Sequence, residues 1–185
     1  MANVDAAFGY KPVRHMAGGV IRQNAYSLAD GYSTSLFTGD PVVLTGTGRN
    51  IQIATAGSSA LVVGVFCGCQ YVTAAGEVVF GRYWPASTDV QGDIITYVWD
   101  DPNILFIGQA SGSVVAADIG LLADMASGTG STLTGTSGWE IGASTGSENQ
   151  LQLLELWPAG SNAYGANAVV AFLFAKHHFR ALTEV

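Results

Sequence analysis

The chain has 185 residues, of which 49% are hydrophobic and only 11% are charged, and its formal net charge is −7. An ordinary globular protein has about 25% charged residues, and the seven Lys and Arg residues of this chain are scattered between Lys11 and Arg180, so we expect no direct nucleic-acid partner. No apolar run approaches the ~20 residues that a membrane-spanning helix needs, so no membrane span is expected. The mean hydropathy of +0.31 is high for a soluble monomer and predicts apolar surface that lies against another protein.

The first part of the chain differs from the rest. Residues 8–15 combine aromatic, glycine, proline and basic residues, and residues 16–19 interrupt any periodicity. Pro12 favours an extended backbone at this point. We therefore expect an ordered N-terminal arm over residues 1–34 that packs on its own domain or on a neighbour, followed by one domain over residues 35–185. A plain first strand with a frayed tip is the alternative.

From Phe37 onward, short runs rich in Val, Ile, Leu and aromatic residues alternate with Gly, Asn, Asp and Pro turns, which is typical of strands. The expected strands are 42–45, 50–54, 61–72, 77–84, 94–99, 104–109, 151–157 and 168–175. Residues 100–103 (Asp-Asp-Pro-Asn) predict a hairpin between 94–99 and 104–109. The spacing indicates an all-β sandwich or barrel, and glycines inside the longest strand indicate bulges or barrel bends.

The second half of the chain contains one helix candidate and two polar loops. Residues 116–126 predict no more than a single helical turn, with Asp118 as a possible cap and Gly120 weakening it. Residues 127–138 and 143–150 are rich in Gly, Ser and Thr and predict surface loops. The last two strands are apolar at consecutive positions, which predicts burial on both faces, against the arm or against another subunit.

Two local patterns resemble catalytic groupings. Residues 142–146 match the G-x-S-x-G pattern of serine hydrolases around Ser144. That motif requires a strand before it and a helix after it, whereas here a polar turn and a strand follow, so we interpret the match as chance in a Gly/Ser/Thr-rich chain. The neighbouring carboxylates of Asp100 and Asp101 are explained by turn chemistry. We expect no enzyme activity and no cofactor.

Metal-binding patterns are equally weak. Cys67 and Cys69 are expected to be reduced and buried. Residues two positions apart on one strand lie at the outer limit of the distance that a disulfide can span. His177 and His178 point to opposite faces of a strand, so they cannot both join His15 at one ion. We expect no metal site.

The aromatic residues leave an alternative open. Trp84, Trp99, Trp139 and Trp157, with seven tyrosines, could line a sugar-binding groove. Without an alternation that exposes a row of rings, a core or interface position is favoured.

Three parts of the chain together resemble one family. Residues 7–15 (AFGYKPVRH) are similar to the start of small proteins encoded among the head genes of tailed bacteriophages. Residues 38–44, 51–54 and 62–66 resemble the first half of their barrel core, and residues 175–180 (AKHHFR) resemble their C-terminal end. The middle of the chain, about residues 85–150, is similar to these proteins only in its general character. The chain thus resembles capsid decoration, or cement, proteins.

The resemblance implies a small antiparallel β-barrel or β-tulip-like domain with an extended N-terminal arm and at most one short helix. It also implies a homotrimer, with other homo-oligomers as the alternative, that binds the major capsid protein outside the expanded head, where capsid subunits meet. The implied location is the virion exterior, after synthesis in the cytoplasm of the bacterial host; the N-terminus shows no secretory signal. Phe8, Tyr10, Pro12 and Arg14 are the expected contacts with the shell or with a neighbouring subunit. Alternatives are a head-fibre base or tail-tube protein, or a carbohydrate-binding β-sandwich.

Overall fold

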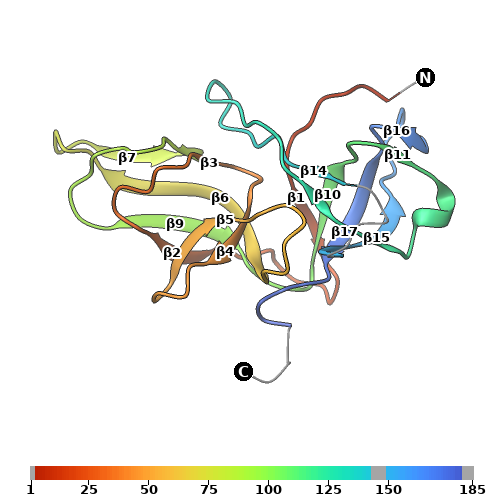
Figure 1. Cartoon of the computed structure of the whole chain (residues 1–185), viewed down its shortest axis with the longest axis horizontal. Coiled ribbons are helices and arrows are strands. Elements are labelled where there is room, and N and C mark those ends of the chain that lie inside the picture. Colours follow the sequence, from red (N-terminus) through yellow and green to blue (C-terminus); the bar gives the residue numbers. More distant parts are fainter. Residues whose placement is uncertain (1–2, 143–148, 181–185) are drawn as a thin grey trace.

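The computed structural model describes residues 3–142 and 149–180, which form an all-β protein with two lobes side by side (Figure 1). The strands are β1 (Lys11–His15), β2 (Asn24–Leu28), β3 (Leu36–Phe37), β4 (Pro41–Leu44), β5 (Asn50–Ile53), β6 (Val62–Val72), β7 (Val78–Gly81), β8 (Tyr83–Trp84), β9 (Ile94–Trp99), β10 (Ile104–Gln109), β11 (Ser113–Val114), β12 (Leu122–Ala123), β13 (Met125–Ala126), β14 (Glu140–Ile141), β15 (Leu151–Leu156), β16 (Gly165–Ala166) and β17 (Val169–Phe174). One 3₁₀ turn, Ala116–Asp118, interrupts them. The all-β fold class expected from the sequence is confirmed.

The first lobe is a small closed barrel. Its strands follow the order β4-β5-β2-β9-β6, and β4 pairs with the start of β6 to close the ring. β7 pairs with the end of β6, along the edge opposite β9. The pairs are antiparallel except β2 with β5, which run parallel. Gly68 lies in a bulge of β6 at a φ of +155°, where a side chain would be strained, and this lets the long strand bend around the barrel.

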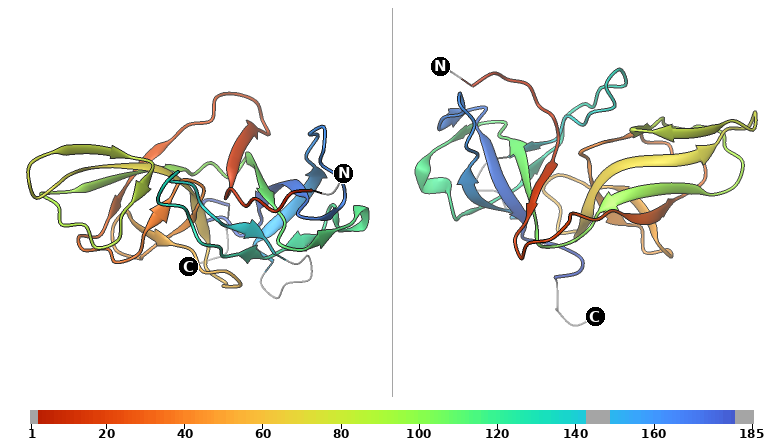
Figure 2. Two further views of the ribbon diagram at one scale, coloured as in Figure 1. Left: turned by 90° about the horizontal axis from the view of Figure 1, so that it is seen from above. Right: turned by 180° about the vertical axis from the view of Figure 1, so that it is seen from behind.

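The second lobe is built on a five-stranded antiparallel sheet in the order β1-β10-β17-β15-β12. The last strand of the chain, β17, lies at its centre between β10 and β15. Two short ribbons, β11 with β16 and β13 with β14, flank this sheet. The chain enters the barrel between β1 and β2 and returns to this lobe between β9 and β10. Figure 2 shows the two lobes from two further sides.

Strand β6 joins the two lobes because it is buried on both faces. Val63 and Phe66 point into the barrel, together with Trp84 and other apolar side chains. Val62 and Val65 point outward and belong to the core cluster of the second lobe. This arrangement explains the uninterrupted apolar run of the sequence, since alternation disappears when both sides of a strand are covered. The protein therefore has two hydrophobic clusters that share one strand.

Buried polar groups connect the lobes further. The side chain of Gln150 is fully buried and its Oε1 accepts hydrogen bonds from Gly57 N at 3.1 Å and Met125 N at 3.3 Å, while its Nε2 donates to Thr55 O at 3.3 Å. The segment after β17 forms a short parallel bridge to the start of β6, through His177. These bonds satisfy backbone groups that would otherwise be buried without partners.

One expected pairing is wrong. The strands predicted at 94–99 and 104–109 are present as β9 and β10, but they do not form a hairpin: β9 pairs with β2 and β6, and β10 pairs with β1 and β17. The turn residues between them carry the chain from the barrel to the second lobe. At this crossing Gly64 lies so close to Trp99 O that a Cβ atom would overlap it. The turn residues 100–103 thus end β9, but they do not determine which strand β10 pairs with.

The region expected as an N-terminal arm supplies strands to both lobes. Residues 11–15 form β1 of the five-stranded sheet, and residues 24–28 form β2 inside the barrel. The boundary placed after residue 34 thus falls within the barrel sequence, because the barrel closes only with β2. The helix candidate is limited to one 3₁₀ turn, where Asp118 Oδ2 accepts a hydrogen bond from Val115 N at 2.8 Å.

Candidate functional site

Tyr10, one of the four expected contact residues, is a core residue. Its side chain is fully buried, and its ring packs edge-to-face against Phe172 at 4.8 Å and Phe174 at 6.0 Å between ring centroids. Its hydroxyl donates a 2.7 Å hydrogen bond to Glu140 O. Gly9 makes this burial possible, with a φ of +70° and no room for a Cβ beside Ser137. The expectation that Tyr10 contacts a partner is therefore wrong.

The other three expected contact residues remain at the surface. Phe8 is half-buried and carries the Lys11 ammonium 4.5 Å from its ring centroid. Pro12 is half-buried opposite Phe106 of β10. Arg14 is exposed and forms a 2.9 Å ion pair with Glu155 of β15.

Arg14 reaches across the outer face of the five-stranded sheet. A small apolar cluster on this face has Leu105, Ala171 and Leu173 buried at its centre, with partly buried side chains packed around them. Those surrounding side chains are Val13, Ile107, Leu154 and Trp157. We call these seven residues, with Arg14 and Glu155, the outer face. It combines a partly exposed apolar rim with one ion pair.

The first residues of the described chain are held against their own lobe. Asn3 Nδ2 donates to the carbonyl oxygens of Ala163 and Ala166, at 2.8 and 2.9 Å. Gln109 binds the same segment by donating to Val4 O at 2.7 Å and accepting from Ala6 N at 2.9 Å. Residues 3–10 therefore pack on the second lobe of the same chain, one of the two possibilities that the sequence left open.

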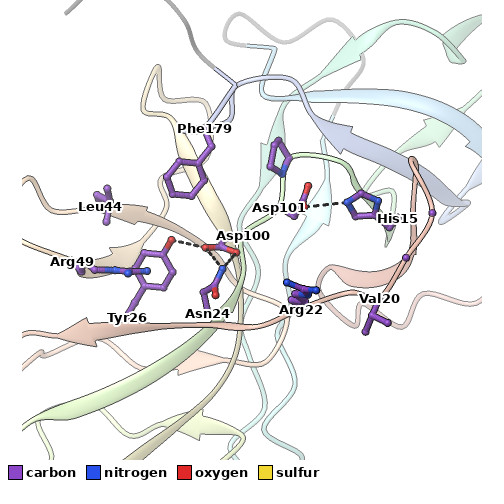
Figure 3. A pocket seen from close by; sticks show the side chains of 13 residues that line it. His15, Val20, Arg22, Asn24, Tyr26, Leu44, Arg49, Asp100, Asp101 and Phe179 are labelled. Carbon is purple, nitrogen blue, oxygen red and sulfur yellow. Dashed lines mark hydrogen bonds and ion pairs between the residues drawn. The ribbon is translucent and has the colours of Figure 1, made fainter.

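A cleft of about 860 Å³ opens where the chain crosses between the lobes (Figure 3). Its lining comes from the β1–β2 connection, the strands β2 and β4, the β9–β10 connection and the segment after β17. The labelled side chains are His15, Val20, Arg22, Asn24, Tyr26, Leu44, Arg49, Asp100, Asp101 and Phe179.

Asp100 is the polar centre of this cleft. It is 7% exposed, and its carboxylate accepts hydrogen bonds from Asn24 Nδ2 at 2.8 and 3.0 Å and from the Tyr26 hydroxyl at 2.7 Å. Burial and the Asp100 carboxylate raise the pKa of Tyr26 well above its usual 10, so this hydroxyl stays a donor. The Arg49 guanidinium lies 4.4 Å from the centroid of the Tyr26 ring.

The carboxylate of the next residue, Asp101, also has partners within the chain. Its Oδ1 accepts from Asn103 N at 2.8 Å, and its Oδ2 lies 3.1 Å from His15 Nε2. The backbone and His15 hydrogen bonds, which outweigh the opposing effect of burial, lower the pKa of Asp101 below 3.8. Both carboxylates thus have partners within the chain, as expected for a structural turn.

The residues considered as metal ligands or nucleophiles do not gather. Burial lowers the pKa of His177 to about 4, and its Nδ1 accepts a hydrogen bond from Phe179 N, so it is a neutral core histidine. Cys67 and Cys69 are free thiols whose pKa burial raises to about 12. Within residues 3–142 and 149–180, no three His, Cys, Asp or Glu side chains are placed to hold a metal ion together. Ser144 lies outside the described residues.

The tryptophans do not form an exposed row. Trp84 and Trp139 are buried, and Trp99 and Trp157 are half-buried against separate clusters.

The parts of the chain that the structure describes contain no helix long and apolar enough to cross a membrane. Comparison of the chain with protein-family models, with curated protein sequences and with solved structures gave no significant match.

Sequence reasoning missed the cleft. Its polar residues come from positions as distant as Arg22, Arg49 and Asp100, and they meet only because β2, β5 and β9 are neighbours in the barrel. The one local signal in the sequence is the pair Asp100 and Asp101. Turn chemistry explains this pair, but nothing in the sequence places it at the wall of a cleft.

Proposed function

We propose that this protein is a structural component of a bacteriophage virion, a decoration or cement protein that binds the outside of the expanded head at junctions of the major capsid protein. The role is one of stabilisation and not of catalysis, and the working assembly is a homotrimer. The proposal rests on the resemblance of the N-terminal, barrel and C-terminal segments to that family.

One structural observation carries the proposal. Phe8, which precedes β1, and Lys11 and Arg14 of β1 lie at the surface of the second lobe, and Arg14 belongs to the outer face. Among the described strands β1 pairs only with β10, so it forms the edge of its sheet. An aromatic and two basic side chains on a protein with a net charge of −7 give this edge a composition suited to another protein.

The edge itself is protected against indiscriminate strand pairing. It carries Lys11 and Pro12, and the register shifts between Pro12 and Arg14 through a bulge. Lysine, proline and bulges are the devices that keep edge strands from aggregating. Contacts with a capsid subunit are therefore made by side chains of this surface, not by adding a strand.

The stabilising effect follows from mass action. A protein that binds only the expanded shell lowers the free energy of that state by an amount that grows with its free concentration relative to the dissociation constant. If expansion completes the binding site, binding is specific for the mature head.

Co-sedimentation with expanded heads of the source phage that lack this protein tests the proposal. Saturable binding to expanded heads and none to unexpanded heads is the expected result. The variant Phe8→Ser with Arg14→Glu should weaken binding, whereas Arg82→Glu, which makes the same charge change on the link between β7 and β8, should bind as wild type. Truncation of the N-terminus is unsuitable because it would remove Tyr10 from the core.

Other results would favour the alternatives. A folded protein that ignores heads but forms rings or fibres in solution would be a tail-tube or fibre component. A shift of tryptophan fluorescence with glycans would favour the carbohydrate-binding alternative, although the buried Trp84 and Trp139 give that alternative little support.

A further inference from the structure

We propose that the cleft between the lobes binds a short acidic segment of a partner polypeptide, with carboxylates held by Arg22 and Arg49 and an apolar side chain against Phe179. This site lies apart from the outer face, and the inference does not depend on the proposed capsid role. The cleft volume of about 860 Å³ falls within the range of roughly 300–1,000 Å³ that ligand sites occupy.

The positive charges of the cleft lack carboxylate partners. Among the described residues, the Arg22 side chain forms no hydrogen bond or ion pair, and the polar interactions of the Arg49 side chain are with the Tyr26 ring and hydroxyl. Both side chains line the cleft and belong to exposed residues (Figure 3). Two of the seven basic residues of an acidic protein therefore line this cleft without a carboxylate partner among the described residues.

The acidic residues of the cleft do not compete for these arginines. Asp100 accepts three hydrogen bonds from Asn24 and Tyr26, and Asp101 is taken by Asn103 N and His15. Both carboxylates are thus already hydrogen-bonded within the chain, and neither forms an ion pair with Arg22 or Arg49 among the described residues. Guanidinium N–H groups are the donors left for a ligand, and their planar fork matches a carboxylate.

The rest of the lining is apolar. Val20 and Phe179 are 80% and 53% exposed, and the half-buried Leu44 also lines the cleft. An inorganic anion would leave these side chains in water. A peptide that places an aliphatic or aromatic residue between two carboxylates would cover them and meet both arginines.

The two aspartates also select against dense negative charge. Asp100 and Asp101 lie at the wall of the cleft, so a multiply charged phosphate would approach two carboxylates as well as two guanidiniums. Separate single charges, as on a peptide, are held at the arginines with less of this repulsion. The expected ligand is therefore an acidic peptide.

Fluorescence anisotropy of the full chain with a fluorescein-labelled, amidated Gly-Glu-Leu-Glu-Phe-Gly peptide at low ionic strength tests the site. We expect saturable binding that weakens with added salt, and much weaker binding of the matched peptide with Gln in place of Glu. Arg22→Gln and Arg49→Gln should each weaken binding about fivefold, as for the loss of one partly solvated ion pair. Arg82→Gln is the matched control, because Arg82 is exposed on the connection between β7 and β8, and it should leave binding unchanged.

The inference fails if the Glu and Gln peptides bind equally, or if both cleft variants bind as wild type while circular dichroism shows them folded. Displacement of the peptide by equimolar tripolyphosphate would also overturn it, because the cleft would then be a general anion site. The Arg22 side chain forms no hydrogen bond, ion pair or cation–π contact with the described residues, so its replacement should test recognition with little cost in stability.

Discussion

Two buried titratable side chains predict opposing pH dependences of stability. Asp40 is 1% exposed, and although its Oδ2 accepts a 2.7 Å hydrogen bond from Phe37 N, burial raises its pKa from 3.8 to about 6. His177 is 2% exposed, and burial lowers its pKa from 6.5 to about 4. Each group is therefore less favourable in its charged form when the protein is folded.

The sign follows from proton binding in the two states. Between about pH 4 and pH 6 the folded protein holds a proton on Asp40 that the unfolded chain has released, so the free energy of unfolding falls by about 3 kcal/mol as pH rises through this window. For His177 the unfolded chain binds the extra proton, so the free energy of unfolding rises by about 3 kcal/mol between pH 4 and pH 6.5. In the wild type the two contributions largely cancel.

The variant Asp40→Asn removes the contribution of Asp40 to the pH dependence of stability and leaves that of His177. Asparagine keeps an oxygen for Phe37 N but never ionises, so the variant should gain about 3 kcal/mol relative to the wild type on going from pH 4 to pH 7. The matched variant His177→Gln should show the reverse, gaining about 3 kcal/mol relative to the wild type as pH falls over the same range.

Urea unfolding followed by tryptophan fluorescence at several pH values measures both differences. A difference between Asp40→Asn and the wild type that stays constant from pH 4 to pH 7 would refute the argument that burial controls this carboxyl.

Three further substitutions or reactions test the fold. Tyr10→Ala should lower the free energy of unfolding by about 3–5 kcal/mol and Tyr10→Phe by only about 1 kcal/mol; equal losses in urea titrations would contradict its role as a core ring. Gln150→Leu should cost about 2–4 kcal/mol because it leaves buried backbone groups of both lobes unpaired, and a Tm equal to that of the wild type would show that these bonds are unimportant. Cys67 and Cys69 should react with an aromatic disulfide reagent at pH 8 only after unfolding in urea, since burial raises their pKa to about 12; rapid reaction of both thiols in the native protein would be the contrary result.

The sequence predicted where strands lie better than how they pair. The strands β4, β5, β6, β9, β10, β15 and β17 occupy nearly the expected residues, because apolar runs and turn residues act locally. The two partners of β10, which are β1 and β17, are distant from it in the chain, and local turn chemistry at residues 100–103 indicated a hairpin that does not exist. Pairing depends on which faces the whole protein buries.

The expected contact residues show the same limit on a smaller scale. Regular alternation would place Phe8, Tyr10, Pro12 and Arg14 on one face of an extended segment. The positive φ of Gly9 and the register shift after Pro12 break that alternation, so Tyr10 enters the core while Arg14 reaches the outer face. The consequence of such irregularities becomes visible only in three dimensions.

The position of β17 at the centre of the second lobe also constrains how the chain acquires its fold during synthesis. Every strand of the barrel lies between residues 24 and 99, so that lobe has all its partners once residue 99 has left the ribosome. β1 is made before the barrel but must wait for β10, and β10 and β15 remain separated until β17 is inserted between them. At about 5–20 residues per second, β1 is without its partner strand for several seconds or more. During this time Lys11, Pro12 and the bulge after Pro12 limit unwanted pairing of β1 with strands of other molecules.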